Sequence, residues 1–228
     1  MKPDQDGTFE QYIIRGIPLM IVDRAQSCSG DWISQELAID EYGLEKIVFS
    51  PGDIIIDVGA HVGMFSIYLA KKFPFISILA FEPEPTNFKN LLINLSLNEV
   101  RTVVPRMAAL TKDARLFQLI SPLGNSGGAS GFLNDSTEGT RTTSASHTLQ
   151  DVFESSGIER CKLLKIDCEG AEHEMLSNAE ILSRVEWLSI EVHMNERLAR
   201  EGYSRNGLVE TIRGKIATER LALKFNTI

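Results

Sequence analysis

The sequence lacks several features that would assign it to a class of protein at once. It contains no internal repeat, and no apolar run approaches the roughly 18 residues that a membrane-spanning helix needs. Its start, MKPDQDGTFEQY, is too polar to predict a signal peptide. Three cysteines are an odd number without the spacing of a disulfide framework, so a reducing cytoplasm is the expected compartment.

An excess of basic residues is also missing. The 228 residues carry a formal net charge of −8, which argues against a nucleic-acid partner because phosphates demand a basic surface. The remaining composition, 43% hydrophobic and 24% charged, is ordinary for one globular domain with a substantial core. An acidic or neutral small-molecule partner therefore fits better than a nucleic acid.

From Gly52 onward, strand-like segments alternate with helix-like segments. The expected strands are DIIIDVG, SILAFEP, RTVVPRMAAL, CKLLKIDCEG and VEWLSIEVH (residues 53–59, 77–83, 101–110, 161–170 and 185–193). The expected helices between them cover residues 64–73, 85–98 and 171–182. This alternation predicts a doubly wound α/β fold whose sheet is mostly parallel.

Two regions interrupt the alternation. Residues 1–50 are expected to form an N-terminal cap of strands and a short helix, ahead of a ligand-binding domain over residues 51–228. Residues 121–147 are rich in Gly, Ser, Thr and Asn, and so long a connection within a domain is usually functional or disordered. Because it leads into the fourth strand, this segment is interpreted as a flap over the active site.

The turn DVGAHVG after the first strand is the first candidate for ligand binding. Asp57, Gly59 and Gly63 lie at a strand end, where ligands bind in parallel sheets. Glycine permits positive φ and the close approach of a ligand. The spacing is neither the G-x-G-x-x-G of dinucleotide-binding folds nor the Gly-Lys-Ser/Thr of a P-loop. The aspartate would repel a pyrophosphate, but it suits a ligand that bears an ammonium and a sulfonium.

The second strand ends in AFEPEP, which places Glu82 at the tip of the neighbouring strand. A carboxylate at that point can accept hydrogen bonds from both hydroxyls of an adenosine ribose. The glycine turn alone leaves a purely structural role open. Together with Glu82, it favours S-adenosylmethionine as the ligand.

The fourth and fifth strands both end in acidic segments. LLKIDCEGAEHEML places Asp167 at the end of a buried strand, where a cation, a hydrogen-bond donor or a ligand should meet its charge. The following Glu-His-Glu, residues 172–174, is expected to be solvated, since surface helices are commonly this acidic. WLSIEVH repeats the pattern with Glu191 and His193 at the end of the fifth strand.

Taken together, DVGAHVG, FEPEP and above all LLKIDCEGAEHEML resemble the FkbM family of S-adenosylmethionine-dependent methyltransferases. The resemblance implies a class I, Rossmann-like methyltransferase fold. It also implies O-methylation of a sugar or related hydroxyl in the biosynthesis of polysaccharides, glycolipids or natural products. Residues carried over for the cofactor are Asp57, Gly59, Gly63 and Glu82. Residues carried over as the family's IDxEG element are Asp167, Glu169 and Gly170.

These considerations give a complete set of expected site residues. The expected cofactor-binding residues are Asp57, Gly59, Ala60, Gly63, Glu82, Pro83 and Ala109. The expected substrate-binding residues are Asn125, Glu169, Gly170 and Glu191. For catalysis we expect Asp167 with His61 or His193 as base, because sugar hydroxyls are poor acids. A Mg²⁺ site of Asp167, Glu191 and His193 is the alternative; the metal-free version is preferred because few oxygen ligands are certain.

One departure from the family pattern lies near the C-terminus. The usual fold ends in an antiparallel strand pair, whereas residues 204–221 are predicted as a helix and ALKFNTI supplies one strand at most. The C-terminal edge of the sheet is therefore expected to be abbreviated or completed by a partner, which leaves a homodimer open. A non-catalytic scaffold and a nicotinamide-binding protein are the functional alternatives.

Overall fold

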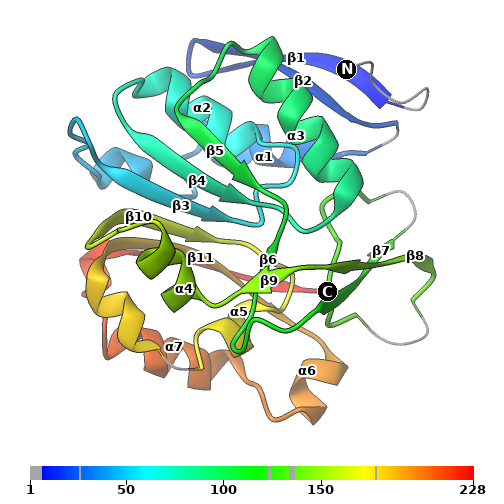
Figure 1. Cartoon of the computed structure of the whole chain (residues 1–228), viewed down its shortest axis with the longest axis vertical. Coiled ribbons are helices and arrows are strands. Elements are labelled where there is room, and N and C mark those ends of the chain that lie inside the picture. Colours follow the sequence, from blue (N-terminus) through cyan, green and yellow to red (C-terminus); the bar gives the residue numbers. More distant parts are fainter. Residues whose placement is uncertain (1–6, 26, 123–124, 134–136, 178) are drawn as a thin grey trace.

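A twisted parallel sheet separates two layers of helices in the computed structural model (Figure 1). The structure describes residues 7–25, 27–122, 125–133, 137–177 and 179–228. The strands of this sheet are β3 (Ile54–Val58), β4 (Ser77–Phe81), β5 (Val103–Arg106), β10 (Cys161–Ile166), β11 (Val185–Met194) and β12 (Leu221–Thr227). Their order is β12-β11-β10-β3-β4-β5, and each runs parallel to its neighbours. The predicted doubly wound α/β fold is confirmed.

The order of the strands reverses between β3 and β10. The chain builds the sheet outward from β3 to β4 and β5, and then returns to place β10 on the other side of β3. Ile55 of β3 pairs with Leu163 of β10, and both side chains are buried in the core. In a doubly wound sheet, the crevice beyond the carboxyl ends of two such strands is where ligands bind.

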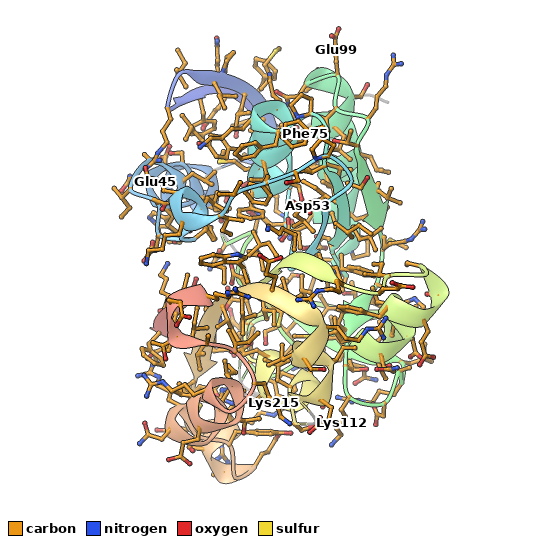
Figure 2. All side chains as sticks on the ribbon, turned by 90° about the vertical axis from the view of Figure 1, so that its left-hand side faces the viewer. Glu45, Asp53, Phe75, Glu99, Lys112 and Lys215 are labelled. Atoms are coloured by element: carbon orange, nitrogen blue, oxygen red, sulfur yellow. The ribbon has the colours of Figure 1, made fainter. Side chains whose placement is uncertain are left out.

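Helices cover both faces of the sheet and bury a separate hydrophobic cluster on each face. The α-helices are α1 (Ser29–Ala38), α2 (Met64–Lys72), α3 (Pro85–Leu97), α4 (Leu149–Ser155), α5 (Glu172–Met175), α6 (Glu196–Arg200) and α7 (Arg205–Arg213), and the 3₁₀ helices are η1 (Leu44–Lys46), η2 (Ala179–Arg184) and η3 (Thr218–Arg220). Figure 2 shows side chains filling the space between the layers, whereas Glu99, just after α3, projects outward. Phe153 of α4 and Ile212 of α7 lie in one cluster, and α2 lies in the other.

In the described part of the chain, six further strands form two-stranded ladders outside the central sheet. They are β1 (Gly7–Ile14), β2 (Ile17–Arg24), β6 (Ala109–Leu110), β7 (Phe117–Pro122), β8 (Gly139–Ser144) and β9 (Ser146–His147). β7 and β8 form an antiparallel hairpin, at the right in Figure 1, which overlaps residues 121–147, the segment predicted as a flap, and begins before it. Of that segment, residues 123–124 and 134–136 lie outside the described residues.

The N-terminal hairpin of β1 and β2 packs against α2 and α3 at the top of Figure 1. Asn94 of α3 accepts a hydrogen bond from the Val22 N–H (2.7 Å) and donates to the Val22 carbonyl (3.0 Å). Asn98 makes the same pair of hydrogen bonds with Met20. These side-chain amides satisfy backbone groups of β2 that would otherwise need a neighbouring strand. The hairpin is therefore fixed to α3, with the end of β2 close to the carboxyl edge of the sheet.

The C-terminal edge of the sheet consists of one strand and not of an antiparallel pair. β12 follows α7 and η3, and it pairs in parallel with β11 from Leu188 to Met194. A parallel neighbour needs a crossover connection, which the helical segment between β11 and β12 provides. The predicted abbreviated edge is confirmed, although the helix predicted over residues 204–221 already ends at Arg213.

Three other elements differ from the prediction. The strand expected over residues 101–110 ends at Arg106, because the backbone of Ala109 and Leu110 pairs with β9 and not with β4. The helix expected over residues 171–182 is split into α5 and η2. α4, which is absent from the predicted elements, begins at a capping box between Thr148 and Asp151.

Within the described ranges, no helix combines the length and the apolar character that crossing a bilayer requires.

Candidate active site

A cavity of about 610 Å³ opens beyond the carboxyl ends of β3, β4 and β10. Its wall contains most of the predicted site residues, namely Gly59, Ala60, His61, Glu82, Pro83, Ala109, Asn125, Asp167, Glu169 and Glu191. The predicted residues outside the wall are Asp57, Gly63, Gly170 and His193. Trp32 of α1, Tyr42 and Asn226 of β12 also line the cavity, and no local sequence pattern indicated them.

The turn after β3 is held by hydrogen bonds from both neighbouring strands. Gly59 and Ala60 donate their N–H groups to the carbonyl of Phe81 at the end of β4 (3.0 and 2.9 Å). Lys165 of β10 donates to the carbonyl of Gly59 (2.8 Å). Gly59 (φ +77°) and His61 (φ +53°) are left-handed, so the chain turns sharply from the strand into α2.

Asp57 is completely buried and contacts protein groups, not the cavity. Ser66 donates to its Oδ2 (2.7 Å), and Lys165 Nζ lies 3.3 Å from its Oδ1. The same Nζ lies 3.5 Å from Asp167 Oδ2, so one ammonium forms ion pairs with carboxylates at the ends of two strands. Burial by itself lowers the pKa of Lys165, but the charges of Asp57 and Asp167 raise that pKa above its usual range. In the sequence, the one feature that indicated these ion pairs is a lysine inside the apolar strand LLKID.

The glycines of the turn are required first by the packing of the backbone. A Cβ on Gly59 would overlap the carbonyl oxygen of Asp167, so the close approach here is between the ends of β3 and β10. Gly63 is the N-cap residue of α2, and a Cβ there would overlap Leu91 of α3. The predicted reason for these glycines, room for a ligand, is therefore secondary to room for β10 and α3.

Glu82 is buried at the end of β4, in the wall of the cavity. The His61 N–H donates to its Oε2 (2.8 Å) and the Glu84 N–H donates to its Oε1 (2.9 Å), so both oxygens have fixed positions. Burial raises the pKa of Glu82 to about 7 despite these hydrogen bonds. Each oxygen keeps a second lone pair with which it can accept a hydrogen bond from a ligand.

His61 contacts the described part of the flap. Its Nε2 lies 2.7 Å from Ser126 Oγ, which also lies 3.0 Å from Asp23 Oδ2 and 2.7 Å from Ser27 Oγ. Asn87 of α3 donates to the carbonyl of Ser126 (2.7 Å). Burial lowers the pKa of His61, and the opposing charge of Asp23 does not cancel this effect, so the ring is neutral at pH 7. Ser126 thus joins the flap to the N-terminal region, the glycine turn and α3.

Carboxylates at the ends of β10 and β11 converge on one histidine. His193 Nε2 lies 3.4 Å from Glu169 Oε2, 3.6 Å from Glu191 Oε1 and 3.9 Å from Asp167 Oδ1. On the other side of the ring, Nδ1 lies 3.4 Å from Glu172 Oε1. The His193 side chain is 1% exposed, whereas Asp167, Glu169 and Glu191 reach the cavity.

These carboxylates determine the proton state of His193. Burial by itself lowers the pKa of the ring, but Glu172, Glu169 and Asp167 raise it to about 10. In this arrangement His193 is protonated at neutral pH, contrary to its predicted role as a neutral base. Burial raises the pKa of Glu169 to about 8. Burial also acts to raise the pKa of Asp167, but Lys165 and His193 hold it below its usual range.

The side chains of α5 are buried, so the prediction that they are solvated is wrong. The exposed fractions are 0% for Glu172, 3% for His173 and 2% for Glu174. Glu172 accepts hydrogen bonds from the N–H groups of Gly170 (2.9 Å) and His193 (2.6 Å). Arg115 donates to both carboxylate oxygens of Glu174 (2.7 and 2.9 Å). Two of these partners, His193 and Arg115, lie far away in the sequence, which is why the local acidic pattern indicated a surface helix instead.

A known family covers most of the segments that build this site. The family described as "Methyltransferase FkbM domain" matches residues 57–210, from the buried aspartate of β3 into α7. The chain belongs to this family. The resemblance found in the three sequence motifs is thereby confirmed, and the FkbM domain contains the glycine turn, Glu82 and the acidic ends of β10 and β11.

Individual relatives of this FkbM domain are more distant. Methyltransferase 1 of Beauveria bassiana (strain ARSEF 2860) is 26% identical over 164 residues, which cover 64% of this chain and 66% of that protein. The 31-O-demethyl-FK506 methyltransferase FkbM of Streptomyces tacrolimicus is 30% identical over 174 residues, which cover 63% of this chain and 66% of that protein. The chain thus spans about two thirds of the length of these relatives. Among solved structures, wild-type Trm5b from Pyrococcus abyssi aligns with a TM-score of 0.42 at 18% identity, over 94% of this chain and 47% of that one.

Proposed function

We propose that this FkbM domain transfers a methyl group from S-adenosylmethionine to a hydroxyl oxygen of a sugar or related biosynthetic small molecule. Membership of the family supports methyl transfer, and one relative is named as a methyltransferase of a 31-O-demethyl compound. The observation that carries the proposal is a buried carboxylate, Glu82, that shares one cavity wall with the sharp turn after β3.

The residues around the turn fit S-adenosylmethionine. Glu82 offers two oriented oxygens to the ribose hydroxyls. Asn87 lies in the same wall, and its buried Oδ1 has no hydrogen-bond partner among the described residues, so it offers a further acceptor to a polar ligand. Small or backbone surfaces provide the remaining contacts, from Gly59, Ala60, Pro83 and Ala109. When bound, S-adenosylmethionine supplies a methyl group activated by a positively charged sulfur.

The acidic side of the cavity suits a neutral, hydroxylated acceptor. Asp167, Glu169 and Glu191 lie in the wall, and the charge of ionised Asp167 repels an anionic acceptor. Ionised Asp167 can accept a hydrogen bond from the acceptor hydroxyl and so orient its oxygen toward the methyl carbon. Asn125 of the flap adds an amide to the same cavity. Positioning of this kind supplies much of the acceleration of a displacement reaction.

His61 is the side chain best suited to take the hydroxyl proton. It lies in the cavity wall, and burial lowers its pKa, so it is neutral at pH 7. Its Nδ1 has no hydrogen-bond partner in the described part of the chain. In the transfer, the acceptor oxygen bonds to the methyl carbon while the carbon–sulfur bond breaks, and the hydroxyl proton passes to His61.

Calorimetric titration with S-adenosylhomocysteine tests the cofactor assignment. Glu82→Ala should weaken binding by about 1–3 kcal/mol, because the ribose hydroxyls lose a charged acceptor. Glu99→Ala, at an exposed position, is the matched control and should bind as the wild type does. Equal affinity of the Glu82 variant and the wild type would refute the assignment. A parallel titration with NADH separates the nicotinamide-binding alternative.

Transfer of a radiolabelled methyl group tests the acceptor class. We expect labelling of neutral acceptors from a panel of sugars, polyols and hydroxylated macrocycles. Sugar phosphates of the same ring structure are the matched comparison, because they differ by a charge that the acidic wall should repel. Labelling of the phosphates alone would contradict the proposed class.

A further inference from the structure

We propose that Asp167, Glu169 and His193 bind a divalent metal cation at the acceptor side of the cavity. One ligand atom from each residue lies within 4.8 Å of the other two. Two ligands held about 2.1 Å from one ion are about 3 Å apart in neighbouring positions and about 4.2 Å apart across it. Small rotations of these side chains therefore bring the three atoms onto a common ion.

The unsatisfied ring of His193 provides an independent reason for a ligand at this point. Its side chain is 1% exposed. Nε2, the ring nitrogen on the side of the three carboxylates, lies 3.4–3.9 Å from them, beyond the usual length of a hydrogen bond. Buried imidazoles are normally hydrogen-bonded. An ion between Nε2 and the carboxylates would satisfy this nitrogen and the oxygens together.

The contacts of the two glutamates decide which of them is a ligand. Glu191 is engaged by β12, because Asn226 donates to its Oε1 (2.9 Å) and Lys224 Nζ lies 3.4 Å from its Oε2. The carboxylate of Glu169 has His193 as its one ion-pair partner within the described ranges. Glu169 therefore replaces Glu191 in the ligand set that the strand ends suggested from the sequence.

The surroundings of the three residues also suit a cation. Glu172 is 0% exposed and lies 3.4 Å from His193 Nδ1, on the side away from the proposed ion. A metal-bound histidine usually directs its second ring nitrogen at a carboxylate in this way. The nearest ammonium, that of Lys165, is already shared between Asp57 and Asp167. A divalent ion that replaces the Nε2 proton of His193 raises the positive charge among these carboxylates.

The proposed function gives the ion a task, and this part of the inference rests on it. Asp167 and Glu169 line the cavity, so the open positions of an ion between them face the acceptor. Three protein ligands leave room for two neighbouring oxygens of one acceptor, as in a diol or a hydroxy-ketone. A bound hydroxyl becomes a stronger acid, which favours its attack on the methyl carbon. The acceptor should therefore carry two adjacent oxygens.

Binding of Mn²⁺ to the whole chain, followed by electron paramagnetic resonance and calorimetry, tests the site without an activity measurement. Mn²⁺ suits the carboxylate ligands of this site and gives a direct paramagnetic signal. We expect one Mn²⁺ per chain, with nitrogen coupling from His193. Glu169→Gln and His193→Gln should each weaken Mn²⁺ binding about tenfold or more, and His193→Gln should remove the nitrogen coupling.

Control variants separate this site from a general effect of charge. Glu99→Gln and His147→Gln make the same chemical changes at exposed positions and should leave Mn²⁺ binding unchanged. Glu191→Gln should change it less than Glu169→Gln; the reverse order would overturn the ligand set. Circular dichroism and binding of S-adenosylhomocysteine verify that each variant is folded.

Two results would overturn the ion itself. One is a wild-type chain that binds no Mn²⁺ at millimolar concentration, and the other is full Mn²⁺ binding by both the Glu169 and His193 variants. If S-adenosylhomocysteine still binds in such a case, the proposed function stands and the metal site falls. If Mn²⁺ binds but S-adenosylhomocysteine does not, the metal site stands and the proposed cofactor falls.

Discussion

Lys165 Nζ lies 3.3 Å from Asp57 Oδ1, and the pair joins β10 to β3 inside the core. Removing one partner leaves the other charge buried, so Lys165→Met should lower the free energy of unfolding by about 3–5 kcal/mol. Lys162 lies on the same strand and pairs with Glu186 at 2.9 Å, where the side chains are 14% and 31% exposed. Lys162→Met should cost about 0–1 kcal/mol. Urea denaturation measures both, and equal losses would contradict the importance of the buried pair.

Gly59→Ala should destabilise the fold and not only block a ligand. The added Cβ would overlap the Asp167 carbonyl, and relieving that overlap requires β3 and β10 to move apart. Gly157 has a similar positive φ of +63°, but a Cβ added there would meet nothing within 4 Å, so Gly157→Ala isolates the cost of the backbone conformation. Gly157→Ala should lower the free energy of unfolding by about 1–2 kcal/mol. Thermal unfolding curves compare the two, and equal shifts would rule out the steric explanation.

Affinity for S-adenosylhomocysteine should rise with pH around neutrality. The pKa of Glu82 is about 7, and its ionised form is the better acceptor for the ribose hydroxyls. Binding should therefore be about fourfold weaker at pH 6.5 than at pH 8.5. The groups that influence Glu82 are Glu84, His61 and Lys165. Calorimetry on Glu82→Gln provides the control, because the affinity of this variant should no longer depend on pH. An unchanged pH dependence would assign the titration to another group.

Ser126→Ala should loosen the described part of the flap. The hydroxyl contacts His61, Asp23 and Ser27, so its loss removes the side-chain links from the flap to the glycine turn and to the N-terminal region. Hydrogen exchange of residues 125–133 should become faster, while exchange in β10 stays the same. Thr143→Ala, exposed on β8, is the control within the same hairpin. Unaltered exchange in the Ser126 variant would show that other contacts hold the flap.

Glu172→Gln should destabilise the protein, against the expectation for a solvated glutamate. Each carboxylate oxygen accepts one backbone N–H, from Gly170 and from His193, and an amide has only one acceptor oxygen. One N–H then loses its partner, which should cost about 1–3 kcal/mol. Chemical denaturation compares this variant with Glu99→Gln, which should be neutral. A neutral effect at both positions would contradict the assigned hydrogen bonds.

The parts of the fold and of the site that could be predicted depend on local patterns. β3, β4 and β10 are apolar runs with a polar residue at the end, and their order along the chain places Glu82 and Asp167 at one edge of a parallel sheet. The lengths of the apolar runs and the helical spacing between them were sufficient to predict that placement. The bounds of shorter elements, such as α5, depend on distant partners and were less accurate.

The remaining features arise from contacts between distant segments. Burial of Glu172 depends on the backbone of His193, and the engagement of Glu191 depends on Lys224 of β12. Ser126 contacts His61 although the two residues are 65 positions apart in the sequence. Nothing in the neighbouring residues of any of these positions indicates the partner, so their roles could be assigned only from the structure.

The pairing of β3 with β10 has a consequence for synthesis on the ribosome. The glycine turn emerges with the first strands of the sheet, but the Asp167 carbonyl against which Gly59 packs arrives only with β10, after β4 and β5. Until then one edge of β3 is unpaired, and such edges invite association with other chains. A product released before β10 would contain the whole glycine motif without a binding site. Nascent chains of this protein should therefore depend on chaperone protection until β10 has left the exit tunnel.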